Sequence, residues 1–415
     1  MTESHHPEAE YSPPQAQLQQ SDLLRRREFI FRLAAGGCAL CAGLSLDDAA
    51  NGAAHADQDQ ATLLDGGVAE ETERYTAPAL YWEEKVGLIV CKLCPRECSV
   101  PPRERGYCGV RENQQGEYKT LVYSRPCSLL VDPIEKKPLS HFLPGTTALS
   151  LATAGCNIEC KFCQNWQLSQ MRPEQVAAKH LSPKQIVGHA VQTGAPTIAF
   201  TYSEPVVFFE YMLDIAKEGK KRRINAVMIS NGYIQKEPLA ELLPHLSAIK
   251  IDLKAFTEKF YKESCSGELQ PVLDRLQQIK AAGLWLELVV LIIPTLNDSA
   301  EECRKMCQWI FKNLGPDTAI HFSAFRAMYK LLRLPPTPVT TLERNRKIAV
   351  EEGLPYAYIG NVPGHPGEHT YCSKCDKIVI KRQGYRTQSL LKNGKCPFCE
   401  TIIPGVFVNP LKSLY

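Results

Sequence analysis

The stretch ALSLATAGCNIECKFC, residues 148–163, joins a short apolar run to three closely spaced cysteines. The apolar run at 148–153 has the length and composition of a buried β-strand. Directly after it, Cys156, Cys160 and Cys163 share one loop in the spacing C-x3-C-x2-C. Because thiolates are soft ligands that suit iron–sulfur centres, this loop can ligate three irons of a cubane cluster.

The motif carries no fourth cysteine, so one iron of such a cluster keeps an open coordination position. An open position serves a centre that binds substrate, whereas a structural zinc site closes its tetrahedral shell with four ligands. We therefore predict a [4Fe-4S] cluster on the three cysteines and regard zinc as a poor alternative there.

Short β-branched runs alternate with amphipathic helical patterns from residue 145 to residue 346. Strands separated by helices are typical of βαβ units and a parallel sheet. We predict an α/β fold, a partial (βα)6 barrel with its chemistry at the carboxyl ends of the strands. The strands are expected at residues 148–153, 197–201, 225–230, 248–253, 285–293 and 319–325, and the helices at 205–223, 238–246, 272–282 and 300–314.

Composition divides the chain into four regions. We expect a disordered, signal-like region at 1–77, a cysteine-rich segment at 78–144, the core barrel at 145–368 and a zinc-ribbon-like tail at 369–415. The hydrophobic share of 44% and the charged share of 22% are ordinary for a globular protein. The formal net charge is only +3 and forms no basic stripe, so we do not expect nucleic acid as a partner.

The amino-terminal region has the order of a signal peptide. Three arginines at 25–27 precede a mildly apolar run at 31–46, and small residues at 54–56 resemble a cleavage site. Paired arginines favour the twin-arginine type, and the run is too short and too glycine-rich for a transmembrane helix. A poorly ordered extension with accidental arginines is the alternative. The signal predicts export, whereas cluster assembly and low-potential electrons predict the cytoplasm, so both destinations stay open.

Polar side chains follow three of the expected strands. They are Ser203 and Glu204 after the second strand, Ser230 and Asn231 after the third, and Asp252 and Lys254 after the fourth. The Glu204 carboxylate could bind a ligand's ammonium group or cap the helix that Pro205 opens. Asp252 and Lys254 alternate on one face of a strand and point opposite charges into the same space, unless they form a surface ion pair.

Three further features leave two interpretations open. Ser230 and Asn231 offer small polar groups for a ribose or a carboxylate, or they form a plain turn with Gly232. Glu287 lies inside an apolar run, and a buried carboxylate needs a partner, so a role in the cavity is one of two open interpretations of this residue. His365, in a turn-rich segment, is either a proton donor or a loop residue.

Eleven of the seventeen cysteines fall into three tight groups, which predicts three metal sites. Besides the central three, they are Cys372, Cys375, Cys396 and Cys399, and Cys91, Cys94, Cys98 and Cys108. The paired C-x2-C spacing of the tail set is the zinc-ribbon pattern, and we predict zinc there. For the amino-terminal set, zinc and an auxiliary iron–sulfur cluster both stay open. The other six are expected to be small buried hydrophobes: Cys38, Cys41, Cys127, Cys265, Cys303 and Cys307.

The central motif, with Phe162 just before the third cysteine, resembles the radical S-adenosylmethionine (SAM) superfamily. That resemblance implies that SAM binds the open iron and is cleaved reductively to methionine and a 5′-deoxyadenosyl radical. It also implies cofactor contacts from Phe162, Ser203, Glu204, Ser230, Asn231 and Asp252, and catalytic roles for the three cysteines, Asp252 and Lys254. The family often has Gly-Gly-Glu-Pro where this chain has only Glu204-Pro205, so the backbone contact of those glycines is not expected.

The ordered set of motifs is narrower than the superfamily. CKLCPREC at 91–98, GYCGVREN at 106–113, CQNW at 163–166, SNGY at 230–233, DLK at 252–254 and the tail together resemble the radical SAM component of the AmmeMemoRadiSam system. That family is akin to pyruvate formate-lyase activating enzymes. It implies Memo-like and AMMECR-type partners and an electron donor such as flavodoxin or ferredoxin.

The resemblance implies an enzyme that abstracts hydrogen from a peptide or protein substrate. A glycyl-radical enzyme activase is one alternative, although the extra cysteines of such activases usually follow the central motif and here precede it. A zinc-binding scaffold with an inactive barrel is the alternative of another class, and the three cysteines with Glu204 argue against it.

Overall fold

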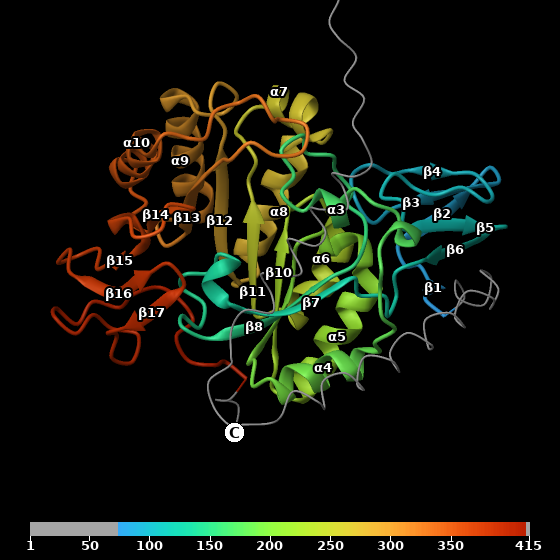
Figure 1. Cartoon of the computed structure of the whole chain (residues 1–415), viewed down its shortest axis with the longest axis horizontal. Helices are drawn as coiled ribbons and strands as arrows, with labels where there is room; N and C mark the ends of the chain where they lie inside the picture. The colour runs from blue at the N-terminus through green and yellow to red at the C-terminus, as the bar shows by residue number, and fades with distance from the viewer. Residues whose placement is uncertain (1–73, 412–415) are drawn as a thin grey trace, which may run out of the picture. The chain divides into compact units, whose positions relative to one another are not determined.

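The computed structural model describes residues 74–411, so the signal-like segment, Cys38 and Cys41 lie outside the described residues. Its centre is an eight-stranded sheet in the order β14-β13-β12-β11-β10-β9-β8-β7 (Figure 1). Strands β8 to β14 pair in parallel, and β7 pairs antiparallel with β8. The strands are β7 (Ser128–Pro133), β8 (Thr147–Ala152), β9 (Thr197–Phe200), β10 (Asn225–Ser230), β11 (Ala248–Asp252), β12 (Trp285–Ile292), β13 (Ala319–Ala324) and β14 (Ala357–Gly360).

Helices connect successive parallel strands, as expected for a chain of βα units. The longer ones are α4 (Pro183–Gln192), α5 (Phe209–Lys221), α6 (Lys236–Leu242), α8 (Leu269–Ala281), α9 (Ala300–Leu314) and α10 (Val339–Glu351). Short elements are α3 (Trp166–Ser169), α7 (Glu258–Phe260), the π-helix η5 (Tyr261–Cys265) and 3-10 turns η1 (Ile134–Lys136), η2 (Pro173–Gln175), η3 (Pro205–Phe208), η4 (Leu243–His245) and η6 (Pro366–Glu368).

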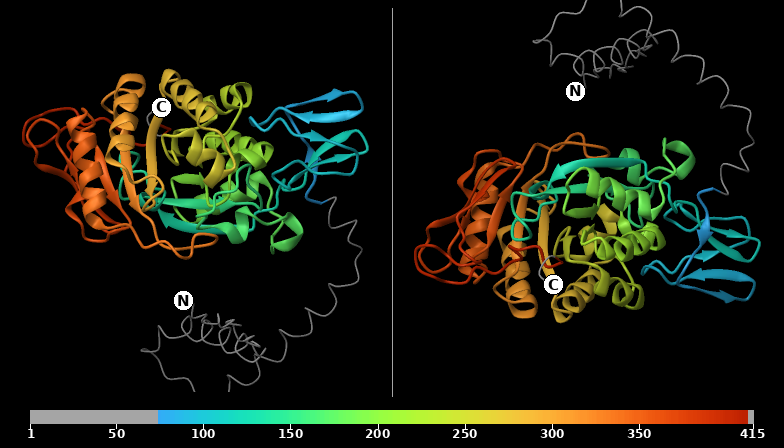
Figure 2. Two further views of the ribbon diagram at one scale, coloured as in Figure 1. Left: turned by 90° about the horizontal axis from the view of Figure 1, so that it is seen from above. Right: turned by 90° about the horizontal axis from the view of Figure 1, so that it is seen from below.

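Small sheets flank the central one at opposite ends (Figure 2). On the amino-terminal side, β1 (Ala77–Pro78), β5 (Arg111–Gln114) and β6 (Glu117–Thr120) form one sheet, and β2 (Trp82–Lys85), β3 (Leu88–Cys91) and β4 (Ser99–Val100) another. The tail sheet has β15 (Thr370–Tyr371), β16 (Ile378–Gln383) and β17 (Arg386–Ser389). In residues 74–411 no helix is long and apolar enough to cross a membrane.

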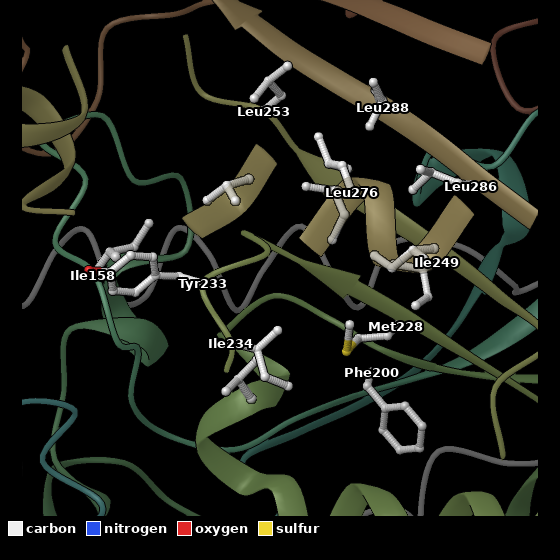
Figure 3. Close-up of a cluster of buried hydrophobic side chains, with 14 of the residues drawn as sticks. Ile158, Phe200, Met228, Tyr233, Ile234, Ile249, Leu253, Leu276, Leu286 and Leu288 are labelled. Carbon is white, nitrogen blue, oxygen red and sulfur yellow. The ribbon is translucent and has the colours of Figure 1, made fainter. Parts of the chain in front are cut away.

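The helical face of the sheet carries the larger apolar layer. Phe200, Met228, Ile249 and Leu288 come from four neighbouring strands and lie in one cluster with Leu276 of α8 (Figure 3). Alternate side chains of each strand share a face, so every second residue contributes to this layer. The strands are buried on both faces, which explains why they are nearly continuous apolar runs.

The opposite face packs against the connection between β7 and β8. Ala199, Val227 and Ala248 contact this connection, which contributes Leu139 and Phe142. Small alanines on the strands leave room for the larger side chains of the connection. This second apolar cluster therefore closes one end of the sheet's inner face, opposite to the end described below.

All six expected strands are present, but the expectation of six was too low. Strand β14 was not among the expected strands, and β7 was assigned to the cysteine-rich segment. The expected boundary between residues 144 and 145 falls within the hairpin that joins β7 to β8. Helices α4 and α10 were not among the expected helices.

Candidate active site

A cavity of about 360 Å³ opens at the carboxyl ends of the central strands. It contains every residue that the sequence assigned to the core site: Cys156, Cys160, Phe162, Cys163, Ser203, Glu204, Ser230, Asn231, Asp252 and Lys254. Because the carboxyl ends of parallel strands lie at one edge, residues up to a hundred positions apart converge there.

The backbone holds the three-cysteine loop firmly. Glu159 N–H donates to Cys265 O at 2.9 Å, and Lys161 N–H donates to Ser264 O at 2.9 Å. The Arg96 guanidinium also donates to the carbonyl of Asn157. The loop is thus fixed from the π-helix on one side and from the cysteine-rich segment on the other.

Gly155 permits this packing. Its φ of +99° is in the region that favours glycine, and a Cβ there would meet Val110 Cγ1 at 2.6 Å and Cys108 O at 2.9 Å. The residue before Cys156 therefore lies directly against the amino-terminal cysteine segment.

The three central sulfurs fit an iron–sulfur cluster better than a single metal ion. Within residues 74–411, the tail set is the only group of ligand atoms that all lie within 4.8 Å of one another, so the sulfurs of Cys156, Cys160 and Cys163 are more widely spread. A cubane carries each thiolate on a different iron, which requires such spreading. All three sulfurs line the same cavity. The donor set and its placement therefore suit the predicted cluster.

The surroundings of the sulfurs are polar and specific. Burial raises the pKa of the Cys156 thiol well above its ordinary value and also raises the pKa of Cys163. Cys163 Sγ lies 3.1 Å from the Ser169 hydroxyl. A hydrogen bond from the buried Cys265 thiol lowers the pKa of Cys160. Cys265 was expected to be a plain buried residue, and its contact across a hundred positions had no signal in the sequence.

Glu204 is a buried carboxylate surrounded by donors. Oε1 accepts from the Ser230 hydroxyl at 2.6 Å and from Val206 N–H at 3.1 Å, and Oε2 accepts from Asn231 N–H at 2.8 Å. Burial raises the pKa of Glu204 to about 7, although these donors oppose the shift. Glu204 therefore caps the turn that begins at Pro205 and also faces the cavity, so the two interpretations coexist.

Ser203 and Asn231 differ in whether their side-chain polar groups already have hydrogen-bond partners. The Ser203 hydroxyl is buried and has no hydrogen-bond partner among the described residues, which leaves it available for a ligand. Asn231 Nδ2 donates to Asn157 Oδ1 at 2.9 Å and lies 3.8 Å from Cys156 Sγ. Phe162 packs on Phe260, with ring centroids 5.7 Å apart, and lines the same cavity.

Asp252 and Lys254 are paired inside the cavity rather than at the surface. Lys254 Nζ lies 3.1 Å from Asp252 Oδ2, and Lys250 Nζ contacts Oδ1 of the same carboxylate. Burial alone would raise the pKa of Asp252, but the two ammonium groups hold it at about 2. Lys250 was missed, although its position two residues before Asp252 puts it on the same strand face.

Two predicted residues lie away from this cavity. Glu287 does not line the cavity, so its cavity interpretation does not hold. It is fully buried and accepts hydrogen bonds from Ser140 N–H, His141 N–H and Trp285 Nε1, and its Oε2 lies 2.8 Å from His321 Nε2. His365 lies outside the cavity lining and caps a short turn by accepting from Gly367 N–H at 2.9 Å. Its loop interpretation therefore holds.

The tail cysteines form a compact four-sulfur site. The sulfurs of Cys372, Cys375, Cys396 and Cys399 all lie within 4.8 Å of one another. Cys372 Sγ is 3.5 Å from Cys399 Sγ, and Cys375 Sγ is 3.7 Å from Cys396 Sγ. Four thiolates at Zn–S distances of about 2.3 Å would be about 3.8 Å apart, so this site could hold one metal ion.

The amino-terminal cysteines are neighbours but not compact. Cys94 and Cys108 each interact electrostatically with Cys91 and Cys98. No three of these sulfurs lie within 4.8 Å of one another. Burial raises the pKa of Cys108 to about 11, so the thiol stays protonated without a metal.

Known proteins share parts of this sequence and fold. A family model described as the radical SAM superfamily matches residues 150–310. Uncharacterized protein MJ0808 of Methanocaldococcus jannaschii is 43% identical over 314 residues, 75% of this chain and 93% of that protein. The pyruvate formate-lyase-activating enzyme of Clostridium pasteurianum is 25% identical over 166 residues, 39% of this chain and 67% of that enzyme. Among solved structures, Streptococcus suis SuiB bound to precursor peptide SuiA has a TM-score of 0.42 and 14% identity, over 55% of this chain and 51% of SuiB.

Proposed function

The chain belongs to the radical SAM superfamily and is related to pyruvate formate-lyase activating enzymes, and we propose that it uses a SAM-derived radical to abstract hydrogen from a peptide or protein substrate. The observation that carries this proposal is the convergence of the three central cysteines, Glu204 and Asp252 on one cavity. When bound, a [4Fe-4S] cluster on Cys156, Cys160 and Cys163 supplies the electron that splits SAM into methionine and the 5′-deoxyadenosyl radical.

The chain's own residues bind and orient SAM. We assign the ammonium of SAM to the Glu204 carboxylate, because a buried carboxylate gains most from a cation that it can hydrogen bond. The unpartnered Ser203 hydroxyl is available for a polar group of the same ligand. We assign the carboxylate of SAM to Lys254, which Asp252 holds in place. The remaining predicted contacts are Phe162, Ser230 and Asn231.

Two alternatives rank lower. A glycyl-radical enzyme activase would use the same cavity, but the additional cysteines of this chain precede the central motif, which favours the first proposal. A zinc-binding scaffold with an inactive barrel would not require the three central cysteines and Glu204 to meet at one cavity. The described sheet is proposed to be the partial barrel of such enzymes.

Further metal sites complete the proposal. We assign zinc to the tail set, because its sulfur separations of 3.5 and 3.7 Å are close to the separation expected around one zinc ion. For Cys91, Cys94, Cys98 and Cys108 we propose a metal site, with zinc first and an auxiliary iron–sulfur cluster as the alternative. The same proposal includes membership of the AmmeMemoRadiSam system. It also includes Memo-like and AMMECR-type partners and an electron donor such as flavodoxin or ferredoxin. We also propose that the cluster is assembled in the cytoplasm and that the protein stays there, with twin-arginine export as the alternative.

Anaerobic reconstitution tests the central proposal. With iron, sulfide, dithionite and SAM, the native chain should form 5′-deoxyadenosine, and Cys156→Ala should form none. Cys127→Ala is the matched control, because Cys127 belongs to none of the three cysteine groups. If native protein that carries its cluster forms no 5′-deoxyadenosine, the scaffold alternative gains.

A further inference from the structure

A second charged cluster, formed by residues that the sequence analysis did not single out, presents Lys136 and Lys137 to the cavity. Asp132 Oδ1 lies 2.8 Å from Lys136 Nζ, and Asp132 Oδ2 lies 2.7 Å from Lys137 Nζ. The hydroxyls of Ser150 and Tyr202 also donate to Asp132, the former at 2.7 Å. We call Asp132, Lys136 and Lys137 the Asp132 cluster.

The Asp132 cluster is set apart from the cysteines. Lys254, at the cysteine end, interacts with Cys160 and Cys265. Asp132 pairs with Ala148 near the start of β8, whereas the three-cysteine loop follows the end of that strand. Lys137 interacts with Asp132, Lys136 and Lys250. The Asp132 cluster therefore lies toward the end of β8 that is away from the sulfurs.

The Asp132 cluster has an excess of positive charge and unused hydrogen-bond donors. Two ammonium groups face one carboxylate, which leaves an excess of one positive charge. Burial alone would raise the pKa of Asp132, but hydrogen bonds from Lys136 and Lys137 hold it well below its usual range, so the carboxylate stays ionised. An ammonium has three N–H donors, and Lys136 uses one of them on Asp132. The other two N–H donors of Lys136, which lines the cavity, are therefore free to bind an acceptor on a ligand.

Backbone strain marks the same place. Tyr202, whose hydroxyl reaches Asp132, has a φ of +66°, a conformation that is costly for a tyrosine. The hydrogen bond to Asp132 helps to hold Tyr202 in this conformation beside the cavity that it lines. Among the described residues, no arginine lines the cavity. Arginine is the side chain most often used to bind phosphate through two parallel hydrogen bonds. The single excess positive charge of the Asp132 cluster better matches an anion of charge −1.

We infer that the Asp132 cluster binds a carboxylate group of the substrate, which places the rest of the substrate toward the cysteines. This inference rests on the proposed function, because that function puts SAM between the cysteines and Lys254. It narrows the substrate to a molecule that carries a carboxylate near the carbon to be attacked. The carboxylate belongs to a peptide carboxyl terminus, an acidic side chain or a small acid.

Binding of a simple probe pair tests the inference. Fluorophenylacetate and its neutral amide would be titrated, by fluorine NMR, into anaerobic cluster-loaded protein that is saturated with SAM and holds no reductant. We expect the acid to bind about tenfold more tightly than the amide, because a hydrogen bond to a charged group is worth about that factor. Lys136→Gln should abolish the preference and Lys136→Arg should retain it.

Controls separate this inference from the proposed function. Lys136 is 39% exposed, so its replacement is less disruptive than replacement of the buried Lys137, which serves as the second variant. Lys305→Gln, on the outer face of α9 and paired with Glu301, should leave the preference unchanged. Short peptides with free and amidated carboxyl termini then distinguish a peptide terminus from a small acid.

Three results would overturn the inference. The first is equal binding of acid and amide to the native protein, and the second is a preference that survives in both Lys136→Gln and Lys137→Gln. The third is a loss of SAM affinity in Lys136→Gln, measured by equilibrium dialysis, with probe binding intact, which would assign the cluster to the SAM carboxylate. In each case, formation of 5′-deoxyadenosine by the native protein would still support the proposed function. If the native protein formed no 5′-deoxyadenosine, the proposed function itself would be refuted, independently of the Asp132 cluster.

Discussion

Gly155→Ala should destabilise the protein by a predictable amount. The native φ of +99° costs a residue with a side chain about 1–2 kcal/mol. The new methyl group would also lie 2.6 Å from Val110 Cγ1 and 2.9 Å from the Cys108 carbonyl, and overpacking of this kind costs about 1–3 kcal/mol. The free energy of unfolding should therefore fall by about 2–5 kcal/mol.

Urea unfolding, followed by tryptophan fluorescence, measures this loss. Gly116→Ala is the matched control, because Gly116 has nearly the same φ, +100°, with nothing within 4 Å of the added Cβ. The control should lose only the backbone contribution, about 1–2 kcal/mol. The difference between the two variants isolates the contact between the cysteine loop and the amino-terminal segment.

A second measurement follows the consequence for the metal centre. Because Gly155 adjoins Cys156, displacement of the loop should lower the iron bound per chain after anaerobic reconstitution. If Gly155→Ala and Gly116→Ala lose the same free energy and bind the same iron, the close packing at Gly155 carries no energetic weight and the reasoning fails.

Three other perturbations have expected outcomes. Arg111→Met should lower the free energy of unfolding in urea by about 3–5 kcal/mol, because it leaves the buried Glu210 carboxylate without the guanidinium 2.9 Å away. The double variant Arg111→Met, Glu210→Met should recover most of that free energy. No recovery would contradict the pairing. Burial lowers the pKa of His141 to about 4, so the unfolded chain binds a proton more strongly between pH 6.5 and 4, and stability should fall by about 2 kcal/mol from pH 7 to pH 5. His141→Gln should flatten that slope, and an unchanged slope would refute the assignment. Cys396→Ala should remove one metal ion per chain, measured by elemental analysis, and expose the tail to proteases, whereas Cys127→Ala should keep the metal.

The sequence predicted the parts of the site that lie on strands with a clear apolar period. The ends of β9, β10 and β11 were expected within a residue or two, so Glu204, Asn231 and Asp252 were assigned to one edge of a parallel sheet. Cysteine spacing identified the loop after β8 independently of any period. Both signals are local, and local signals survive without knowledge of the tertiary structure.

Residues that depend on distant pairing were not predictable in this way. Lys137 follows a hairpin strand whose partner is found only in three dimensions, and its role becomes visible only beside Asp132 and Ser150. Glu287 shows the opposite error: its burial was expected, but its partners Ser140 and His141 come from the connection after β7. A buried carboxylate reveals that partners exist and not where they come from.

The tail contributes to the cavity as well as to its own metal site. Tyr385, in the turn between β16 and β17, lines the cavity, and the Arg382 guanidinium donates to Ser140 O at 2.7 Å. Val406 N–H donates to the carbonyl of His141 at 2.7 Å, which adds a second attachment. A chain shortened before residue 369 would therefore lose Tyr385 from the lining of the cavity, together with both attachments to the connection between β7 and β8.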